Sequence, residues 1–95
     1  MKITIIHNPV RSRFEAEIKG EAAVLEYEFV NGAMALIHTF VPPKHRHQGI
    51  AFALIKFALE YARAKDLKVI PGCSSVVLYI EQHPEYEALL LDIDE

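Results

Sequence analysis

The chain has 95 residues, 52% of them hydrophobic, and a formal net charge of −3 at pH 7. This length and composition fit one small domain, residues 1–95, with a packed core, and they exclude an intrinsically disordered chain. The negative balance argues against general nucleic-acid binding, although the charge is uneven: residues 44–47 are basic and the C-terminal segment 81–95 is acidic.

The first part of the chain has the pattern of antiparallel strands. Residues 1–6 form a short apolar segment that we expect to end at His7-Asn8-Pro9. Residues 13–18 alternate with a period of two, which predicts a strand with one solvent-exposed face, and residues 22–30 repeat the pattern. The expected inward positions are Phe14, Ala16, Ile18, Leu25, Tyr27 and Phe29.

Asn31-Gly32 predicts a tight hairpin, because both residues tolerate the positive φ of a type I′ turn. The strand that follows, residues 33–41, is apolar on both faces apart from His38 and Thr39. A strand of that kind is expected at the centre of a sheet, covered on both sides. Pro42-Pro43 ends it, since proline cannot donate to a strand ladder.

The second half of the chain predicts a helix, a strand and another helix. Residues 49–64 carry one continuous apolar stripe at helical spacing, made by Ile50, Leu54, Phe57, Ala58 and Tyr61. Residues 67–70 form a short apolar strand, and the strand–helix–strand order favours a right-handed crossover with parallel pairing. Ser74 or Ser75 can cap a second helix that stops before Pro84. The expected fold class is α+β, a mixed and mostly antiparallel sheet of about five strands with a β-α-β-α C-terminal half.

The segment 44–51 joins the central strand to the long helix and suits an anion. A helix N-terminus presents unpaired N–H groups and the positive end of the helix dipole. Gly49 lets the backbone approach a ligand, Ala51 keeps the first turn slim, and Lys44 and Arg46 add positive charge. On spacing alone, a solvated basic loop is an equal alternative.

Arg46-x-x-Gly49-x-Ala51 resembles the Arg/Gln-x-x-Gly-x-Gly/Ala motif of the GCN5-related N-acetyltransferases (GNATs), and Leu78-Tyr79 with Tyr86 is similar to a later segment of that family. The resemblance implies a GNAT-like fold, truncated relative to a full-length GNAT. It also implies acetyl-CoA as cosubstrate, with the pyrophosphate on the loop amides and the pantetheine arm along the strand. The implied cofactor-binding residues are Thr39, Phe40, Val41, Arg46, His47, Gln48, Gly49, Ile50 and Ala51.

More narrowly, the chain resembles very short GNAT-like proteins that share a His-Thr-x-Val-Pro run, here residues 38–42, a cysteine at Cys73 and a run like residues 79–86. Two positions depart from that group. Phe40 stands where an acidic residue is usual, which removes one candidate base. His47 stands where a glycine is usual, which changes the loop that would hold the phosphates.

Three side chains are candidates for catalysis, each with a structural alternative. The resemblance implies that Tyr79 protonates the departing CoA thiolate; otherwise it is a core tyrosine. Cys73 precedes the second helix, which lowers a thiol pKa. The resemblance makes it a candidate for an acyl-accepting nucleophile or a wall of the acetyl pocket, and otherwise it is an inert buried thiol. His38 could deprotonate the acceptor amine, or be a packed histidine with satisfied nitrogens.

The function expected is therefore transfer of an acetyl group from acetyl-CoA to an unidentified amine, on a small molecule or a protein. A CoA-binding or interaction module without useful turnover is the alternative, and an acidic structural partner without a ligand is a third reading. The spacing of His45, His47 and His83 does not make a zinc site, so no metal is expected. A homodimer is left open.

The single cysteine excludes an internal disulfide and fits a reducing compartment. No run of residues has the form of a signal peptide or the length of a membrane span. We therefore expect a cytoplasmic protein without a membrane partner.

Overall fold

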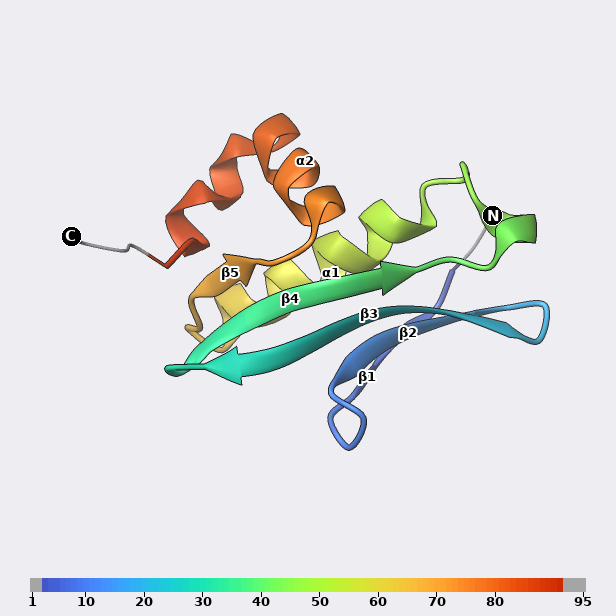
Figure 1. Cartoon of the computed structure of the whole chain (residues 1–95), viewed down its shortest axis with the longest axis horizontal. Coiled ribbons are helices and arrows are strands. Elements are labelled where there is room, and N and C mark those ends of the chain that lie inside the picture. Colours follow the sequence, from blue (N-terminus) through green and yellow to red (C-terminus); the bar gives the residue numbers. More distant parts are fainter. Residues whose placement is uncertain (1–2, 92–95) are drawn as a thin grey trace.

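The computed structural model describes residues 3–91. A single sheet and two helices account for most of them (Figure 1). In chain order the elements are β1 (Ile5–Asn8), β2 (Arg13–Ile18), β3 (Glu21–Val30), β4 (Ala33–Phe40), the 3-10 turn η1 (Pro43–His45), α1 (Ile50–Ala64), β5 (Val69–Pro71), α2 (Ser74–Gln82) and the 3-10 turn η2 (Pro84–Leu89).

The five strands lie in the sheet in the order in which they occur in the chain. β1 to β4 pair antiparallel through successive hairpins, and β5 pairs parallel to β4 after the α1 crossover. Asn31 and Gly32 both have positive φ, 51° and 81°, as the β3–β4 hairpin requires. The expected α+β fold with a mixed, mostly antiparallel sheet is confirmed.

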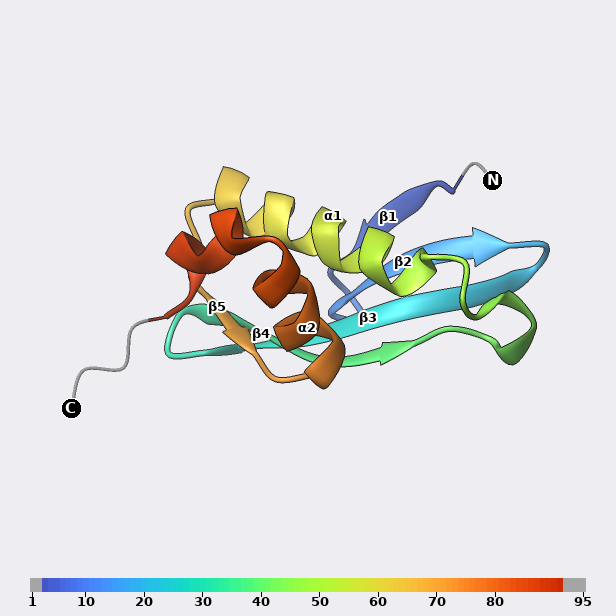
Figure 2. The same cartoon turned by 90° about the horizontal axis from the view of Figure 1, so that it is seen from above.

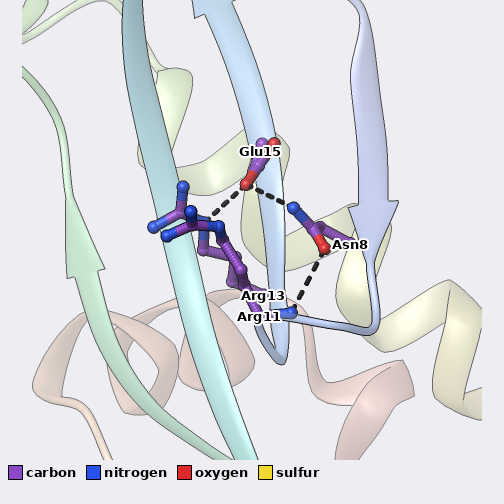
Figure 3. Close-up of polar contacts among 4 residues, drawn as sticks. All are labelled: Asn8, Arg11, Arg13 and Glu15. Atoms are coloured by element: carbon purple, nitrogen blue, oxygen red, sulfur yellow. Dashed lines mark hydrogen bonds and ion pairs between the residues drawn. The ribbon is translucent and has the colours of Figure 1, made fainter.

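The first strand differs from the prediction because it continues through residues that were expected to end it. His7 pairs with Phe14, and Asn8 pairs with Arg13. Figure 3 shows why the hairpin extends this far: Asn8 Nδ2 donates to Glu15 Oε2 at 3.0 Å, and Asn8 Oδ1 accepts from the Arg11 amide at 3.2 Å. The Asn8 side chain thus joins the end of β1 to β2 and to the turn.

Both helices cover the same side of the sheet (Figure 2), with α1 over β2, β3 and β4 and α2 beside β5. The alternation in β2 and β3 delivers their apolar side chains to this side, where they meet the apolar stripe of α1. The fully buried core includes Phe14, Leu25, Met34, Leu36, Ile50, Leu54, Ile55, Leu59, Val69 and Val76. Within the described part of the chain, no helix has both the length and the apolar character needed to cross a membrane.

The opposite side of the sheet, called the open face below, is lined by alternate residues of β1 to β4, among them Ile6, Glu15, Val24, Glu26, His38 and Phe40. The prediction that β4 is covered along its whole length is wrong. The first half of β4 is buried on both sides, whereas Ile37 and Phe40 in its second half are 40% and 42% exposed. The reason is that β5 pairs only with Met34 to Leu36, so the edge of β4 that faces β5 has no neighbouring strand along its second half.

Phe29 also differs from the prediction, because it is 57% exposed rather than buried. It has the parity of Tyr27, with which it makes an edge contact at 5.5 Å between ring centroids. However, Phe29 lies only two residues before the Asn31 turn. Alternation gives the side of the sheet on which a side chain lies, but not whether a helix extends far enough to cover it.

Candidate functional site

The sheet opens beside the second half of β4. The β4–β5 ladder ends where Leu36 pairs with Pro71, and the Gly72 amide donates to the Leu36 carbonyl at 2.9 Å. Beyond this point β4 continues toward η1 while the chain after Gly72 turns into α2 (Figure 1). The irregularity in the β3–β4 register opposite Glu26 and Tyr27 lies at the same level.

A groove of about 570 Å³ lies along this free edge of β4 and the start of α1. We call it the β4–α1 groove. Its walls come from three segments that meet only in the fold: the end of β4, the η1 loop with the first turn of α1, and the start of α2. The lining residues are Thr39, Phe40, Val41, His45, Arg46, His47, Gly49, Ile50, Ala51, Phe52 and Ser75.

The start of α1 leaves backbone donors at this groove. Gly49 is the N-cap, in the left-handed conformation with φ 81°. No side chain of the described residues caps the helix, and the first intrahelical bond runs from the Ala53 amide to the Gly49 carbonyl at 3.0 Å. The amides that precede Ala53 in this turn therefore have no intrahelical acceptor, which together with the helix dipole makes the position favourable for an anion.

The loop before α1 is held at several points. Arg46 Nε donates to the Val41 carbonyl at 2.9 Å, and its guanidinium lies 6.0 Å from the Phe40 ring centroid. The four basic residues do not form one exposed group, because His45 is buried while Lys44, Arg46 and His47 are exposed. His47 has φ 65°, a left-handed conformation that glycine adopts without strain. This explains in physical terms why a glycine suits this position.

Cys73 is the N-cap of α2 and lies across the gap from β4. Its Sγ is 3.7 Å from Thr39 Oγ1, so the structure brings together two of the residues predicted for the site. Burial acts to raise the pKa of Cys73, but hydrogen bonds from Thr39 and from the Ser75 and Val76 amides outweigh burial and lower the pKa below its usual value. A helix N-terminus stabilises a thiolate in the same sense.

Tyr79 is buried beside the groove, not among its lining residues. Its ring contacts Phe52 at 5.1 Å and stacks on His83 at 4.0 Å. Burial raises the pKa of Tyr79, a hydrogen bond with Tyr86 opposes this shift, and Glu85 and Glu60 raise the pKa further. A phenol with a raised pKa stays protonated at neutral pH, as a proton donor must.

His38 does not lie beside Thr39 and Cys73 in the manner expected. It pairs with Glu26 across the ladder, whereas its neighbour Thr39 pairs with buried Leu25. His38 therefore projects to the open face, where it is exposed. Phe40 has the same parity, yet it reaches the rim of the β4–α1 groove. A base at His38 would serve only an acceptor that arrives from the open face.

The histidines considered as metal ligands are dispersed. His45 Nε2 lies 3.2 Å from Glu21 Oε1, whereas His83 Nδ1 lies 2.9 Å from the Tyr79 carbonyl oxygen. Among residues 3–91 no group of three or more His, Cys, Asp or Glu side chains is arranged to hold a metal ion.

Residues 13–89 match the family described as GCN5-related N-acetyl-transferase. The chain belongs to this family. Protein NATD1 of Mus musculus is 35% identical over 85 residues, which cover 86% of this chain and 77% of that protein. NATD1 of Danio rerio is 31% identical over 90 residues, covering 90% and 82%. An NMR structure of a GCN5-like protein from Staphylococcus aureus superimposes with a TM-score of 0.72 at 27% identity, covering 97% of this chain and 91% of that one. The suspected membership in a short GNAT-like family is confirmed.

Three parts of the site were not predicted from the sequence. Phe52 and Ser75 line the β4–α1 groove, and His45 makes a partly buried contact with Glu21. Phe52 could have been predicted, because it follows the Gly49-x-Ala51 motif by one residue and lies on the N-terminal turn of α1. Nothing local in the sequence signals the contact between His45 and Glu21, because the two residues are far apart in the chain.

Proposed function

We propose that this chain is an acetyl-CoA-dependent N-acetyltransferase that transfers an acetyl group to an amine. The observation that carries the proposal is that the uncapped start of α1 and the unpaired edge of β4 border one groove, and that the Cys73 thiol lies 3.7 Å from the hydroxyl of Thr39, which lines this groove. This combination provides donors for phosphate oxygens and a strand edge for an amide-containing arm.

The proposed cofactor contacts follow from these donors. The amides of residues 46–51 would hold the pyrophosphate of acetyl-CoA, with Lys44 and Arg46 adding positive charge. The backbone of Thr39–Val41 would pair with the pantetheine arm in the manner of an added strand. The thioester would then lie near Thr39 and Cys73, where β4 and α2 separate.

In the proposed reaction the acceptor nitrogen attacks the thioester carbonyl carbon directly. Backbone N–H groups of Thr39–Val41 polarise the carbonyl oxygen. The carbon–sulfur bond breaks and Tyr79 protonates the CoA thiolate. The amine proton passes to water or, for an acceptor that arrives from the open face, to His38. A route through Cys73 is the alternative, in which the thiolate first accepts the acetyl group and then passes it to the amine.

A second function, binding of CoA without useful turnover, has an observation of its own in its favour. His38 is exposed on the open face, and Phe40 cannot act as a base. In that case the β4–α1 groove would bind the cofactor while proton transfer from the amine depended on solvent alone.

Calorimetry with acetyl-CoA and a transfer assay over a panel of amines test both functions. We expect acetyl-CoA to bind, the affinity to fall in Arg46→Ala, and transfer to fall in Tyr79→Phe while binding persists. Binding without transfer to any amine would favour the second function, and no heat at millimolar ligand would reject both. Rapid acetylation of Cys73, measured by mass spectrometry, would favour the covalent route.

The acceptor and the compartment are part of the same proposal. The free thiol of Cys73 fits a reducing compartment such as the cytoplasm. Small-molecule amines and protein amines are both compatible acceptors, so the panel should contain polyamines as well as lysine peptides.

A further inference from the structure

His45 is exceptional among the residues of the η1 loop. Apart from tyrosines, it is the only polar side chain that is buried within residues 3–91, with 8% of its surface exposed. Lys44 before it and Arg46, His47 and Gln48 after it are all exposed. Its Nε2 lies 3.2 Å from Oε1 of Glu21, the first residue of β3. The contact therefore joins the loop to the far hairpin of the sheet.

We propose that Glu21 is a positioning residue that orders the η1 loop, residues 43–49, through its hydrogen bond with His45. The proposal rests on the proposed function, because it assigns Glu21 a role in CoA affinity. Glu21 itself does not line the β4–α1 groove, so it acts through His45 and not by contact with the cofactor.

The geometry of the loop supports this role. The chain is anchored in the core at Pro42 and again at Ile50, and the side chains of residues 43–49 are exposed except that of His45. His45 thus divides one long exposed loop into two short segments. The second segment contains the left-handed residues His47 and Gly49. Fixing its origin restricts the direction in which its amides point, and a preordered loop loses less conformational entropy on binding a ligand.

The rigidity of the other partner also matters. Glu21 pairs with Ile18 at the end of the β2–β3 ladder, so its backbone is fixed by the sheet. Its side chain is 43% exposed, whereas that of His45 is 10% exposed. The bond is thus partly shielded, and its loss would leave a buried imidazole nitrogen without this partner.

A second hollow, of about 540 Å³, provides the control. Glu21 also lines this hollow, together with Glu15 and Glu17 on the open face. Removing any of these carboxylates changes the net charge equally, and a purely electrostatic effect on an anionic cofactor would favour tighter binding. Glu17→Ala therefore controls for charge, while Glu21→Gln keeps an oxygen that can accept from Nε2–H.

The test compares the dissociation constants of CoA and of pantetheine, which lacks the phosphates, by calorimetry on the full chain. For Glu21→Ala we expect CoA affinity to fall roughly tenfold, equivalent to about 1.4 kcal/mol, and pantetheine affinity to stay unchanged. Glu17→Ala should bind both ligands as the wild type does, and Glu21→Gln should recover most of the CoA affinity. The double variant Glu21→Ala/His45→Ala should be no weaker than His45→Ala alone.

Several outcomes would overturn the proposal while leaving the proposed function intact. These are unchanged CoA affinity in Glu21→Ala, an equal loss for pantetheine, or strictly additive losses in the double variant. If Glu21→Ala does not fold, the test uses Glu21→Gln and His45→Ala. A Glu21→Gln variant that folds but binds CoA no more tightly than His45→Ala would then overturn the proposal as well. Absence of CoA binding by the wild type would instead reject the proposed function, and the positioning role with it.

Discussion

Gly49 and Gly32 offer a matched pair of substitutions that separates backbone strain from function. Both glycines are left-handed with φ 81°, Gly49 at the N-cap of α1 and Gly32 in the β3–β4 turn. Outside its chain neighbours, a Cβ at either position would meet no atom within 4 Å. Changing either glycine to alanine therefore adds backbone strain without a steric clash. Gly49 lines the β4–α1 groove, whereas Gly32 does not.

The positive φ determines how much each glycine-to-alanine change lowers the free energy of unfolding. A left-handed conformation costs a non-glycine residue roughly 1–2 kcal/mol. Alanine also reduces the entropy of the unfolded chain, which returns roughly 0.4–1 kcal/mol. The net loss is about 1 kcal/mol for each variant, which lowers Tm by roughly 5 °C in a domain of this size. Gly49→Asn should lose less, because asparagine adopts left-handed φ more readily.

Denaturant unfolding measures the stability loss, and calorimetry with CoA measures the functional loss. Gly49→Ala and Gly32→Ala should be destabilised equally, but only Gly49→Ala should bind CoA more weakly, because relief of its strain displaces the amides of the first helical turn. A Gly49→Ala variant as stable as the wild type would refute the strain argument. Equal loss of CoA affinity in both variants would attribute that loss to general destabilisation.

Three further predictions concern single contacts. Because the pKa of Cys73 is lowered by the bond with Thr39 and the helix amides, its alkylation by iodoacetamide should show a pH midpoint below that of an unperturbed cysteine thiol. Thr39→Val should raise that midpoint, and an unchanged midpoint would contradict the effect of the contact. Burial and Lys65 lower the pKa of His7. The contribution of neutral His7 to stability is therefore complete above about pH 6.5 and is lost as the pH falls below that value. His7→Phe should weaken this acid dependence of the free energy of unfolding, which urea unfolding at several pH values would measure. The Tyr86 hydroxyl donates to Glu60 Oε2 at 2.6 Å, so Tyr86→Phe should lower the free energy of unfolding by about 1–2 kcal/mol. A Tyr86→Phe/Glu60→Ala double variant as stable as Glu60→Ala alone would assign that loss to this bond, whereas strictly additive losses would contradict the assignment.

Local patterns predicted most of the fold. Asn31-Gly32 adopts the positive φ values that its composition requires, and residues 13–18 bury Phe14, Ala16 and Ile18 as their alternation predicts. The helix expected at 49–64 begins one residue later, at Ile50. These features depend on neighbours within a few residues, for which a sequence carries direct information.

Features that depend on distant partners were not predicted. The length of β1 depends on Asn8 and Glu15 lying opposite each other, and the exposure of Phe29 depends on where α1 lies. In the sequence His45 is one of four consecutive basic residues, and only the structure shows that it contacts Glu21. In the candidate site, the cofactor-binding residues that the resemblance implied lie along the β4–α1 groove with the exception of Gln48, but strand parity placed His38 on the other side of the sheet from Thr39.

The neighbour-by-neighbour order of the strands has a consequence for how the protein folds. The first four strands need only short hairpin closures, whereas β5 pairs with β4 only after the whole α1 crossover is in place. Contacts between residues far apart in the chain form more slowly than local ones. The β4–α1 groove lies beside the junction of β4 with β5. A ligand that binds only the completed groove would therefore increase the population of molecules in which β5 is paired, at the expense of partly folded molecules.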